Sequence, residues 1–522
     1  MPKPVLALTA GAVLWIALSG AAETQSTQWI VVAAPALRPC LDPLIERRRA
    51  QGLNVVVLET PNAFTAAQIQ AGDGAPLQAR LKDLCAQFPG VSLVLLAGDV
   101  IAANSDAALQ TVVPALPGTV GRMRDQPGDY AYSLPDTNGR PTVAVGRFPA
   151  ANAEQARAMV QKTLNLEDDT RPGAWRHRLF LFMGDPGGGT LGNMMVDPAL
   201  AAGLAQIHPL WTVRAESATA SRFQMPAALL HDTALKSLED GELFSLFLVH
   251  SSAPAIWLTG DQWISRDDLA LARTPRGAGV FFTCGCFACQ LRGAGGEGFG
   301  LAAMRNPAGP VAVMGATSES YSAMGKLALE GLMQPLAKPP FPSRLGAYWL
   351  NVQAGLAEGP MDELTFRLLD QIDGAKGKVP LSVQRREHLE MWLLFGDPAL
   401  RMPIPPLDVT LQTPPSVVAG QPITVDGTIP DRLAGATVHV TLERPSSAEP
   451  AGVDKASPPS AENCARANDF ILTAAEASLS GIHFTCTLTP PSALPWTNLV
   501  LRATATTADQ FAFGILTLAV GR

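Results

Sequence analysis

The fold of this chain is decided by two apolar runs, Leu243-Phe-Ser-Leu-Phe-Leu-Val-His250 and Gly279-Val-Phe-Phe-Thr-Cys284-Gly-Cys286-Phe-Ala-Cys289. Neither run has a helical period, and short continuous runs rich in β-branched and aromatic residues are typical of parallel strands buried on both faces. Residues 265–273 lie between them and combine a serine N-cap, acids in the first turn and a basic last turn, which indicates a crossover helix. A strand-helix-strand unit delivers both strand ends to one edge of the sheet, so we expect His250 and the cysteines to face each other.

Apolar strand patterns and helical patterns also alternate along the rest of the first 400 residues, which predicts a mostly parallel α/β sheet. Predicted strands cover residues 30–34, 53–58, 91–96, 142–149, 179–183 and 310–315, and predicted helices include 41–49, 152–167 and a last group ending near residue 394. After residue 403 the pattern changes to short alternating strands, at 436–442, 483–488 and 498–504, which indicates an Ig-like β-sandwich.

These patterns predict four segments: a signal peptide at 1–22, an N-terminal α/β subdomain at 23–170, a catalytic α/β subdomain at 171–403 and the sandwich at 404–522. We expect the α/β part to own its core and to stay folded without the residues after 406. The signal peptide is inferred from Lys3 followed by an apolar run and small residues up to Ala22. It predicts a secreted or periplasmic protein.

Composition excludes some classes of function. The formal net charge is −7 over 522 residues, with no basic run, which argues against a nucleic-acid partner. No run after the signal peptide reaches the roughly 18 apolar residues of a membrane-spanning helix. Charged residues make up only 16% of the chain while there are 46 Gly and 44 Pro, a composition that suits a loop-rich exported protein.

Seven cysteines in an oxidising compartment suggest disulfides, and they fall into regional groups. Cys40 and Cys85 share the N-terminal region. Cys464 and Cys486 share the C-terminal region, and we expect them to bridge two strands of the sandwich. The group at the strand end, Cys284, Cys286 and Cys289, is odd in number and leaves at least one free thiol.

Several short motifs, taken in order, resemble the gingipain family of cysteine peptidases over roughly residues 29–403. They are Ala97-Gly-Asp99, Asp129-Tyr-Ala-Tyr-Ser133, Val143-Ala-Val-Gly-Arg-Phe-Pro149, His250-Ser-Ser with Trp257, the Cys286 strand end, Ala312-Val-Met-Gly-Ala-Thr317 and Leu394-Phe-Gly-Asp-Pro-Ala-Leu400. The resemblance implies a caspase-like sheet, a protein or peptide substrate and an acyl-enzyme intermediate. It implies no cofactor for catalysis and allows a structural calcium ion. A sandwich after the catalytic domain also fits the family.

By this resemblance, His250 and a cysteine form the catalytic dyad. Cys286 is the preferred nucleophile and Cys284 the second choice, because in caspase-like enzymes the nucleophile follows a small residue and Gly285 precedes Cys286. The backbone N–H groups of Ser251 and Cys286 would then hold the oxyanion. The family has glycine where this chain has Ser251, and we expect the added Cβ to narrow the oxyanion hole.

Other residues have both a functional and an ordinary interpretation. Asp185 and Asp197 are candidates for a third carboxylate that orients the histidine, although loop carboxylates are more often simply solvated. Tyr321 and Trp257 are candidates for the substrate pocket, or plain loop residues. The three clustered cysteines with His250 resemble a zinc ligand set, although the spacing is unusual for one. The whole chain is alternatively a catalytically silent exported protein that serves in binding or secretion.

Overall fold

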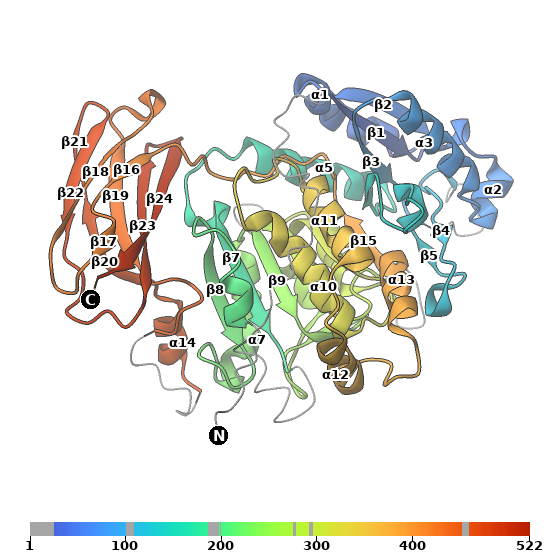
Figure 1. Cartoon of the computed structure of the whole chain (residues 1–522). Coiled ribbons are helices and arrows are strands. Elements are labelled where there is room, and N and C mark those ends of the chain that lie inside the picture. The colour runs from blue at the N-terminus through green and yellow to red at the C-terminus, as the bar shows by residue number, and fades with distance from the viewer. Residues whose placement is uncertain are drawn as a thin grey trace.

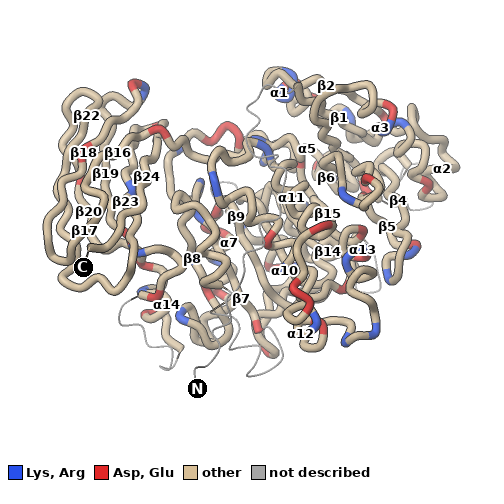
Figure 2. Tube along the Cα trace, in the orientation of Figure 1, with Lys and Arg blue, Asp and Glu red and all other residues tan. Residues whose placement is uncertain are grey.

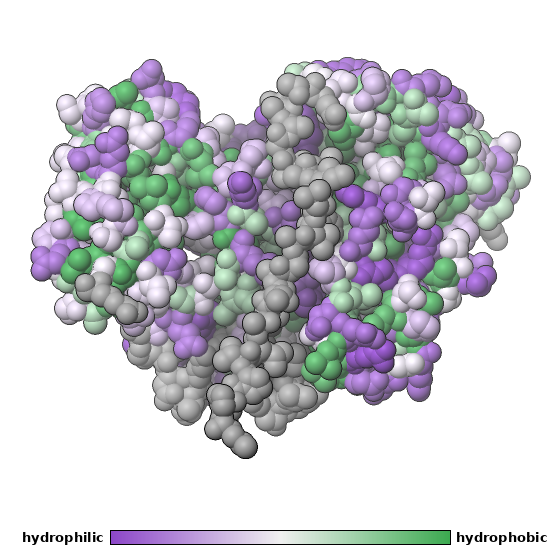
Figure 3. Space-filling model, in the orientation of Figure 1, coloured by the Kyte–Doolittle hydropathy of each residue, from purple (hydrophilic) through white to green (hydrophobic). Residues whose placement is uncertain are grey.

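The computed structural model describes residues 26–100, 109–185, 198, 200–274, 278–291, 296–450 and 459–521. The expected signal peptide and Asp197 lie outside these residues. Figure 1 shows a large α/β body, blue to light orange along the chain, beside a smaller body of darker orange and red strands. Cationic and anionic residues are interspersed over both bodies in Figure 2, and apolar side chains form only small groups on the face seen in Figure 3.

A ten-stranded sheet forms the centre of the larger body, in the order β2-β1-β3-β6-β15-β14-β13-β9-β7-β8. All neighbours run parallel except β14 and β15, which are antiparallel. This mostly parallel mixed sheet fits a caspase-like fold. Its strands are β1 (Thr27–Ala33), β2 (Asn54–Glu59), β3 (Val91–Ala97), β6 (Ala144–Phe148), β7 (Arg178–Met183), β8 (Thr212–Ser217), β9 (Phe244–Leu248), β13 (Ala278–Thr283), β14 (Pro310–Ala316) and β15 (Trp392–Phe395).

The central strands form where apolar residues are continuous, because both faces of the sheet are covered. In β1 every residue from Trp29 to Ala33 is completely buried, and β3 and β6 are buried almost as fully. Each large apolar side chain removed from water in this way contributes roughly 1.5–3 kcal/mol. The sheet core is therefore the main source of stability in the larger body.

Strand β15 corrects the sequence prediction of helices up to about residue 394. Helix α13 (Leu381–Met391) ends at Met391, and the chain enters the sheet directly as Trp392-Leu-Leu-Phe395. All four residues are buried, and so short an apolar run cannot be distinguished from the end of a helix by its period. Because β15 pairs antiparallel with β14 and parallel with β6, the two halves of the sheet have their carboxyl ends at opposite edges.

Buried charged residues account for those motifs of the gingipain resemblance that lie far from the strand ends carrying His250 and the cysteines. Asp397, just after β15, accepts hydrogen bonds from the indole of Trp29 (3.0 Å) and from Arg48 (2.7 and 2.9 Å). Arg147 of β6 is fully buried and binds both carboxylate oxygens of Asp129 (2.7 and 2.8 Å). Buried charges need such partners, so these motifs hold the N-terminal half of the sheet together.

Helices flank the sheet, and α10 and α11 lie in front of it in Figure 1. Helix α8 follows an N-cap at Ser265, which forms a capping box with Asp268, and it confirms the predicted crossover helix. The helices of the larger body are α1 (Asp42–Ala50), α2 (Ala66–Ala71), α3 (Ala75–Gln87), α5 (Ala153–Asp168), α7 (Ala227–Asp240), α8 (Arg266–Leu271), α9 (Phe299–Arg305), α10 (Ser322–Met333), α11 (Leu345–Glu358), α12 (Glu363–Asp373) and α13.

A small antiparallel sheet, not predicted from the sequence, is inserted between β9 and α8. Its strands are β10 (His250–Ser252), β11 (Ala255–Trp257) and β12 (Trp263–Ser265). His250 therefore begins a second strand immediately after β9 ends. A further two-stranded ribbon, β4 (Leu116–Pro117) with β5 (Pro127–Gly128), lies in the connection from β3 to β6.

The smaller body consists of two sheets around a core of its own, in the orders β16-β18-β22-β21 and β17-β24-β23-β19-β20. Buried and exposed residues alternate along β18 and β19, as the period-two pattern predicted. Its assignment to the Ig-like class, and the boundary at residue 404, stay predictions. The strands are β16 (Thr410–Gln412), β17 (Ser416–Val417), β18 (Ile423–Thr428), β19 (Thr437–Glu443), β20 (Ile471–Glu476), β21 (Ser478–Ser480), β22 (His483–Leu488), β23 (Asn498–Thr506) and β24 (Phe511–Val520).

Helix α14 (Ala461–Asn468), which the sequence did not predict, connects the two bodies. Asn468 pairs with the backbone of Ala215 on β8: its Oδ1 accepts from the N–H (2.7 Å) and its Nδ2 donates to the carbonyl (2.8 Å). Strand β8 is the last strand of the ten-stranded sheet, so this carboxamide occupies the place of a missing neighbouring strand. Cys464 and Ala467 of the same helix join the core of the larger body.

The expected Cys464–Cys486 disulfide is wrong. All seven cysteines are free, and these two lie in different cores: Cys464 packs on Ala215 from α14, whereas Cys486 lies on β22 opposite Val425. Their proximity in sequence was misleading because α14 turns away from the sandwich. None of the helices among the described residues is long and apolar enough to cross a membrane.

Candidate active site

The fold brings His250 and the cysteine cluster to neighbouring strand ends. Strands β9 and β13 are adjacent and parallel, with Thr283 opposite Phe247. One residue further, the N–H of Cys284 still donates to the carbonyl of Phe247 (3.1 Å). The expectation that both strand ends share one edge of the sheet is thus confirmed, and it follows from the parallel pairing of the two strands.

Cys286 lies on a sharp turn after β13. The next residue, Phe287, has φ of +60°, a left-handed conformation that is uncommon for a residue with a bulky side chain. Its N–H donates to the carbonyl of Ser318 (3.0 Å), which fixes the turn against the loop after β14. Backbone strain of this kind persists where the surroundings over-determine it, and it often marks a functional loop.

The thiol of Cys286 faces the backbone of Ser320, which donates its N–H to Sγ (3.3 Å) and whose carbonyl lies 3.5 Å away. Burial raises the pKa of this thiol to about 11, and the Ser320 N–H offsets part of that effect by stabilising the thiolate. Within the described residues no hydrogen bond joins the Cys286 thiol to the His250 imidazole. The Cys286 side chain is therefore a neutral thiol rather than half of a preformed ion pair.

The other two cysteines of the cluster contact different parts of the fold. Cys284 directs its thiol to the carbonyl of Gly325 at the start of α10 (3.5 Å), and burial raises its pKa to about 12. Cys289 is completely buried, and burial raises its pKa as well. No three His, Cys, Asp or Glu side chains of the described residues gather as metal ligands would, so the geometry does not support the zinc interpretation.

Ser251 fills the space over Gly285. A Cβ on Gly285 would lie only 2.1 Å from the Ser251 hydroxyl oxygen, so the serine requires glycine at position 285. The Ser251 hydroxyl donates to the carbonyl of Cys286 (2.8 Å). The serine side chain therefore connects the strand end that carries His250 to the turn that carries Cys286.

Tyr321 lies beside this site, and a histidine far away in the sequence holds it there. The N–H of Tyr321 donates to Nε2 of His388 (2.9 Å), while His388 donates from Nδ1 to the carbonyl of Gln384 (2.6 Å). Burial lowers the pKa of His388 to about 3, so the ring is neutral and accepts at Nε2. His388 is thus a buried support of the loop that contacts Cys286, and no local sequence pattern marks it as such.

Arg122 completes the support of this loop. Its guanidinium lies over the Tyr321 ring (4.1 Å), binds Glu387 (2.9 Å) and reaches the side chain of Glu319 (3.1 Å). Sequence patterns gave no sign of these contacts, because the residues are 197 to 265 positions apart. The 318–321 loop is thus fixed by a buried histidine on one side and by an arginine on the other.

The remaining predicted site residues have different positions. Asp185 follows β7 and is exposed, and the N–H of the preceding Gly184 donates to Leu248 at the end of β9 (3.0 Å). Asp185 therefore lies at the same edge of the sheet as His250. Trp257 is directly opposite His250 in the β10–β11 ladder and is 37% exposed.

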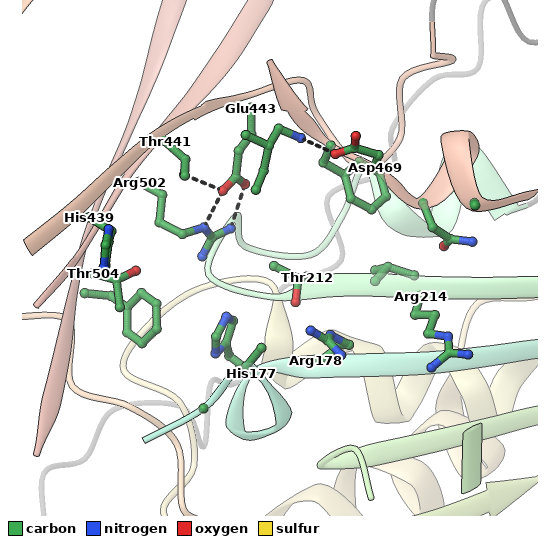
Figure 4. A pocket seen from close by; sticks show the side chains of 18 of the residues that line it. His177, Arg178, Thr212, Arg214, His439, Thr441, Glu443, Asp469, Arg502 and Thr504 are labelled. Carbon is green, nitrogen blue, oxygen red and sulfur yellow. Dashed lines mark hydrogen bonds and ion pairs between the residues drawn. The ribbon is translucent and has the colours of Figure 1, made fainter. Parts of the chain in front are cut away.

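A cavity of about 720 Å³ lies elsewhere, between β8 and the smaller body. Figure 4 shows its polar residues, among them Arg502, which binds both oxygens of Glu443 (2.9 and 3.1 Å). Neither His250 nor Cys286 lines this cavity. It is an interdomain space, and the candidate active site is the strand edge described above.

The model of peptidase family C25 matches residues 22–403, most of the chain. The chain belongs to peptidase family C25. This confirms the resemblance to the gingipain family, and membership of family C25 supports a hydrolase of the cysteine-peptidase type.

A solved structure described as "Structure of Protease" is 16% identical, covers 95% of this chain and 98% of its own, and has a TM-score of 0.55. That likeness shows a shared fold. The SoxY sulfur carrier protein from Chlorobium limicola f thiosulfatophilum (10% identity, 86% of its chain) and the human F-spondin reeler domain (12%, 91%) each overlap 22% of this C25 chain, with TM-scores of 0.14 and 0.15. No curated protein matches this chain.

Proposed function

We propose that this chain is a secreted or periplasmic cysteine endopeptidase in which Cys286 is the nucleophile and His250 the general acid-base. One observation carries the proposal: within a family C25 chain, the ends of β9 and β13 lie side by side and Ser251 connects them by its hydrogen bond to Cys286. Exposure also favours Cys286 over Cys289, which is completely buried.

The chemistry follows from these positions. The Cys286 thiol gives its proton to the His250 imidazole as its sulfur attacks the substrate carbonyl carbon, and the carbonyl oxygen becomes an oxyanion facing backbone N–H groups at the strand ends. The C–N bond then breaks, and His250 gives a proton to the leaving amine. Water hydrolyses the resulting thioester and regenerates the thiol. None of these steps requires a cofactor, and a structural calcium ion remains a proposal by family resemblance.

The substrate has to lie between the two side chains, because the thiol of Cys286 faces Ser320 and makes no hydrogen bond to His250 in the described residues. Catalytic contacts in an empty site are often longer than in the substrate complex. Tyr321, on the loop that contacts the thiol, is in place to border the pocket for the residue before the cleaved bond.

Hydrolysis of unstructured peptides by cysteine variants tests the proposal. We expect Cys286→Ala to lose activity by roughly 10⁴-fold or more, as removal of a nucleophile does. Cys284→Ala is the matched control, because it removes a thiol two residues away that faces α10, and we expect it to retain turnover. An acyloxymethyl ketone probe should modify Cys286 in the mature protein.

The alternative, a catalytically silent exported protein, rests on Ser251 and on the raised pKa of the thiol. It predicts no hydrolysis of any peptide and no modification by the probe. Full activity of Cys286→Ala together with loss in Cys284→Ala would instead transfer the nucleophile to Cys284.

A further inference from the structure

His250 is the first member of a row of side chains across the small sheet β10-β11-β12. The ladder places His250 directly opposite Trp257, and Trp257 directly opposite Trp263. Directly opposed residues of antiparallel strands project from the same face, with Cβ atoms about 5 Å apart. The imidazole and the two indoles therefore form a strip along one face of the small sheet, in which the indole centroids are 5.6 Å apart.

The two faces of this sheet differ in a way that packing does not explain. The alternate positions, Ile256 and Ile264, are completely buried and belong to the core of the larger body. Trp257 and Trp263 on the other face are 37% and 47% exposed. A solvent-facing strand position normally carries a polar residue, and exposed large apolar groups beside a polar site mark binding surfaces.

The position of His250 identifies the part of the substrate that meets these indoles. In the proposed mechanism His250 protonates the leaving amine, so the leaving peptide lies on the histidine side of the cleaved bond. The thiol of Cys286 faces Ser320 instead. Strand β10 contacts Cys286 through Ser251, and β11 and β12 follow it in the order of the small sheet, so a strip that runs from β10 to β12 follows the residues after the cleaved bond.

We propose that Trp257 and Trp263 form a subsite for an aromatic or large aliphatic side chain in the first residues after the cleaved bond. The proposal rests on the proposed function, because it uses His250 as the acid for the leaving amine. Two tilted indoles offer a broad apolar surface with little conformational freedom to lose, which suits a ring or a branched chain.

Cleavage of a peptide series tests the subsite. The peptides share all residues up to the cleaved bond and carry Phe, Leu, Ser or Asp in the two positions after it. We expect kcat/KM to be about tenfold higher with Phe or Leu than with Ser. In Trp263→Ala this ratio should fall toward one, and Trp263→Phe should restore most of it. Leu271→Ala is the matched control, because Leu271 is a 77% exposed apolar residue outside the strip.

A second measurement uses the acyl-enzyme directly. A peptidyl methyl ester carries no residue after the reacting carbonyl, so its hydrolysis by the wild type reports the Cys286 chemistry alone. Added phenylalanine amide and serine amide then compete with water for the thioester, and we expect phenylalanine amide to be the better acceptor in the wild type but not in Trp263→Ala.

The outcomes separate the two proposals. A wild type that hydrolyses neither ester nor peptide overturns the proposed function itself. Ester hydrolysis with equal cleavage of the Phe and Ser peptides, or a preference that Trp263→Ala leaves unchanged, overturns the subsite alone.

Discussion

His388 is a buried neutral histidine, and this should make stability depend on pH. Burial lowers its pKa from 6.5 to about 3, with a smaller effect from nearby Arg122. The unfolded chain therefore binds a proton at a higher pH than the folded protein does. The contribution of neutral His388 to the free energy of unfolding is complete above pH 6.5. It is lost as the pH falls from 6.5 toward 3, by about 1.4 kcal/mol for each pH unit.

We expect His388→Gln to be less stable than the wild type at pH 7 but to lose less stability between pH 7 and pH 5. Glutamine retains an acceptor for the Tyr321 N–H and does not titrate. Urea unfolding at both pH values measures the two differences. Equal losses in wild type and variant would show that His388 does not retain its neutral form on folding.

Ser251 contributes a single hydrogen bond with two consequences. Ser251→Ala leaves the Cys286 carbonyl without its partner, and we expect the free energy of unfolding to fall by about 1 kcal/mol. We also expect kcat/KM to fall several-fold, because the turn that carries the thiol becomes less fixed. Ser251→Gly, which also removes the Cβ, should lose the same bond. If the glycine variant were as stable as the wild type and more active, the serine would be an obstacle in the oxyanion hole rather than a support.

The thiol of Cys286 should react slowly near neutral pH. Its pKa is raised to about 11 by burial, so the thiolate is scarce at pH 7. We expect the rate of iodoacetamide modification to rise about tenfold for each pH unit up to pH 9, as measured by mass spectrometry of the labelled peptide. A rate that is already maximal at pH 7 would indicate an ion pair with His250.

At the scale of the element, α14 holds its place through Asn468. Replacement by leucine, which has a similar size, leaves the N–H and carbonyl of Ala215 unpaired, and we expect a loss of roughly 1–3 kcal/mol. Arg466→Ala changes an exposed residue of the same helix and serves as the control. Thermal unfolding of the three proteins compares them. Equal midpoints would show that the helix is held by its apolar contacts alone.

Elements with one strong local pattern could be predicted, and those set by distant contacts could not. Strands β9 and β13 are continuous apolar runs, so their ends and the position of His250 followed from the sequence. Strand β8 is an edge strand and contains polar residues, so it has no continuous apolar run. Helix α14, which covers it, contacts it through a residue 253 positions away in the sequence. The contact of His388 with Tyr321 spans 67 residues and also has no local signal.

At the scale of the molecule, the two bodies are less independent than the sequence suggested. Each has its own core, but Cys464 and Ala467 of α14 pack in the core of the larger one. A chain ending at residue 406 would lose these contacts and leave β8 open. We expect it to be less stable than the full chain and to aggregate on heating, as light scattering would show. A truncated protein that remains monomeric with an unchanged midpoint would restore the earlier expectation of independent folding.

The hydrogen bonds between Asn468 and Ala215 also have a consequence during synthesis of the chain. Ala215 and Asn468 are 253 residues apart, and a chain grows at roughly 5–20 residues per second, so roughly 13–50 s pass between the synthesis of the two residues. During that interval the backbone N–H and carbonyl of Ala215 on strand β8 lack their partner, because α14 has not yet been synthesised. Two chains in this unfinished state would then expose identical β8 edges to each other. Production of this protein should therefore depend on whatever keeps neighbouring nascent chains apart.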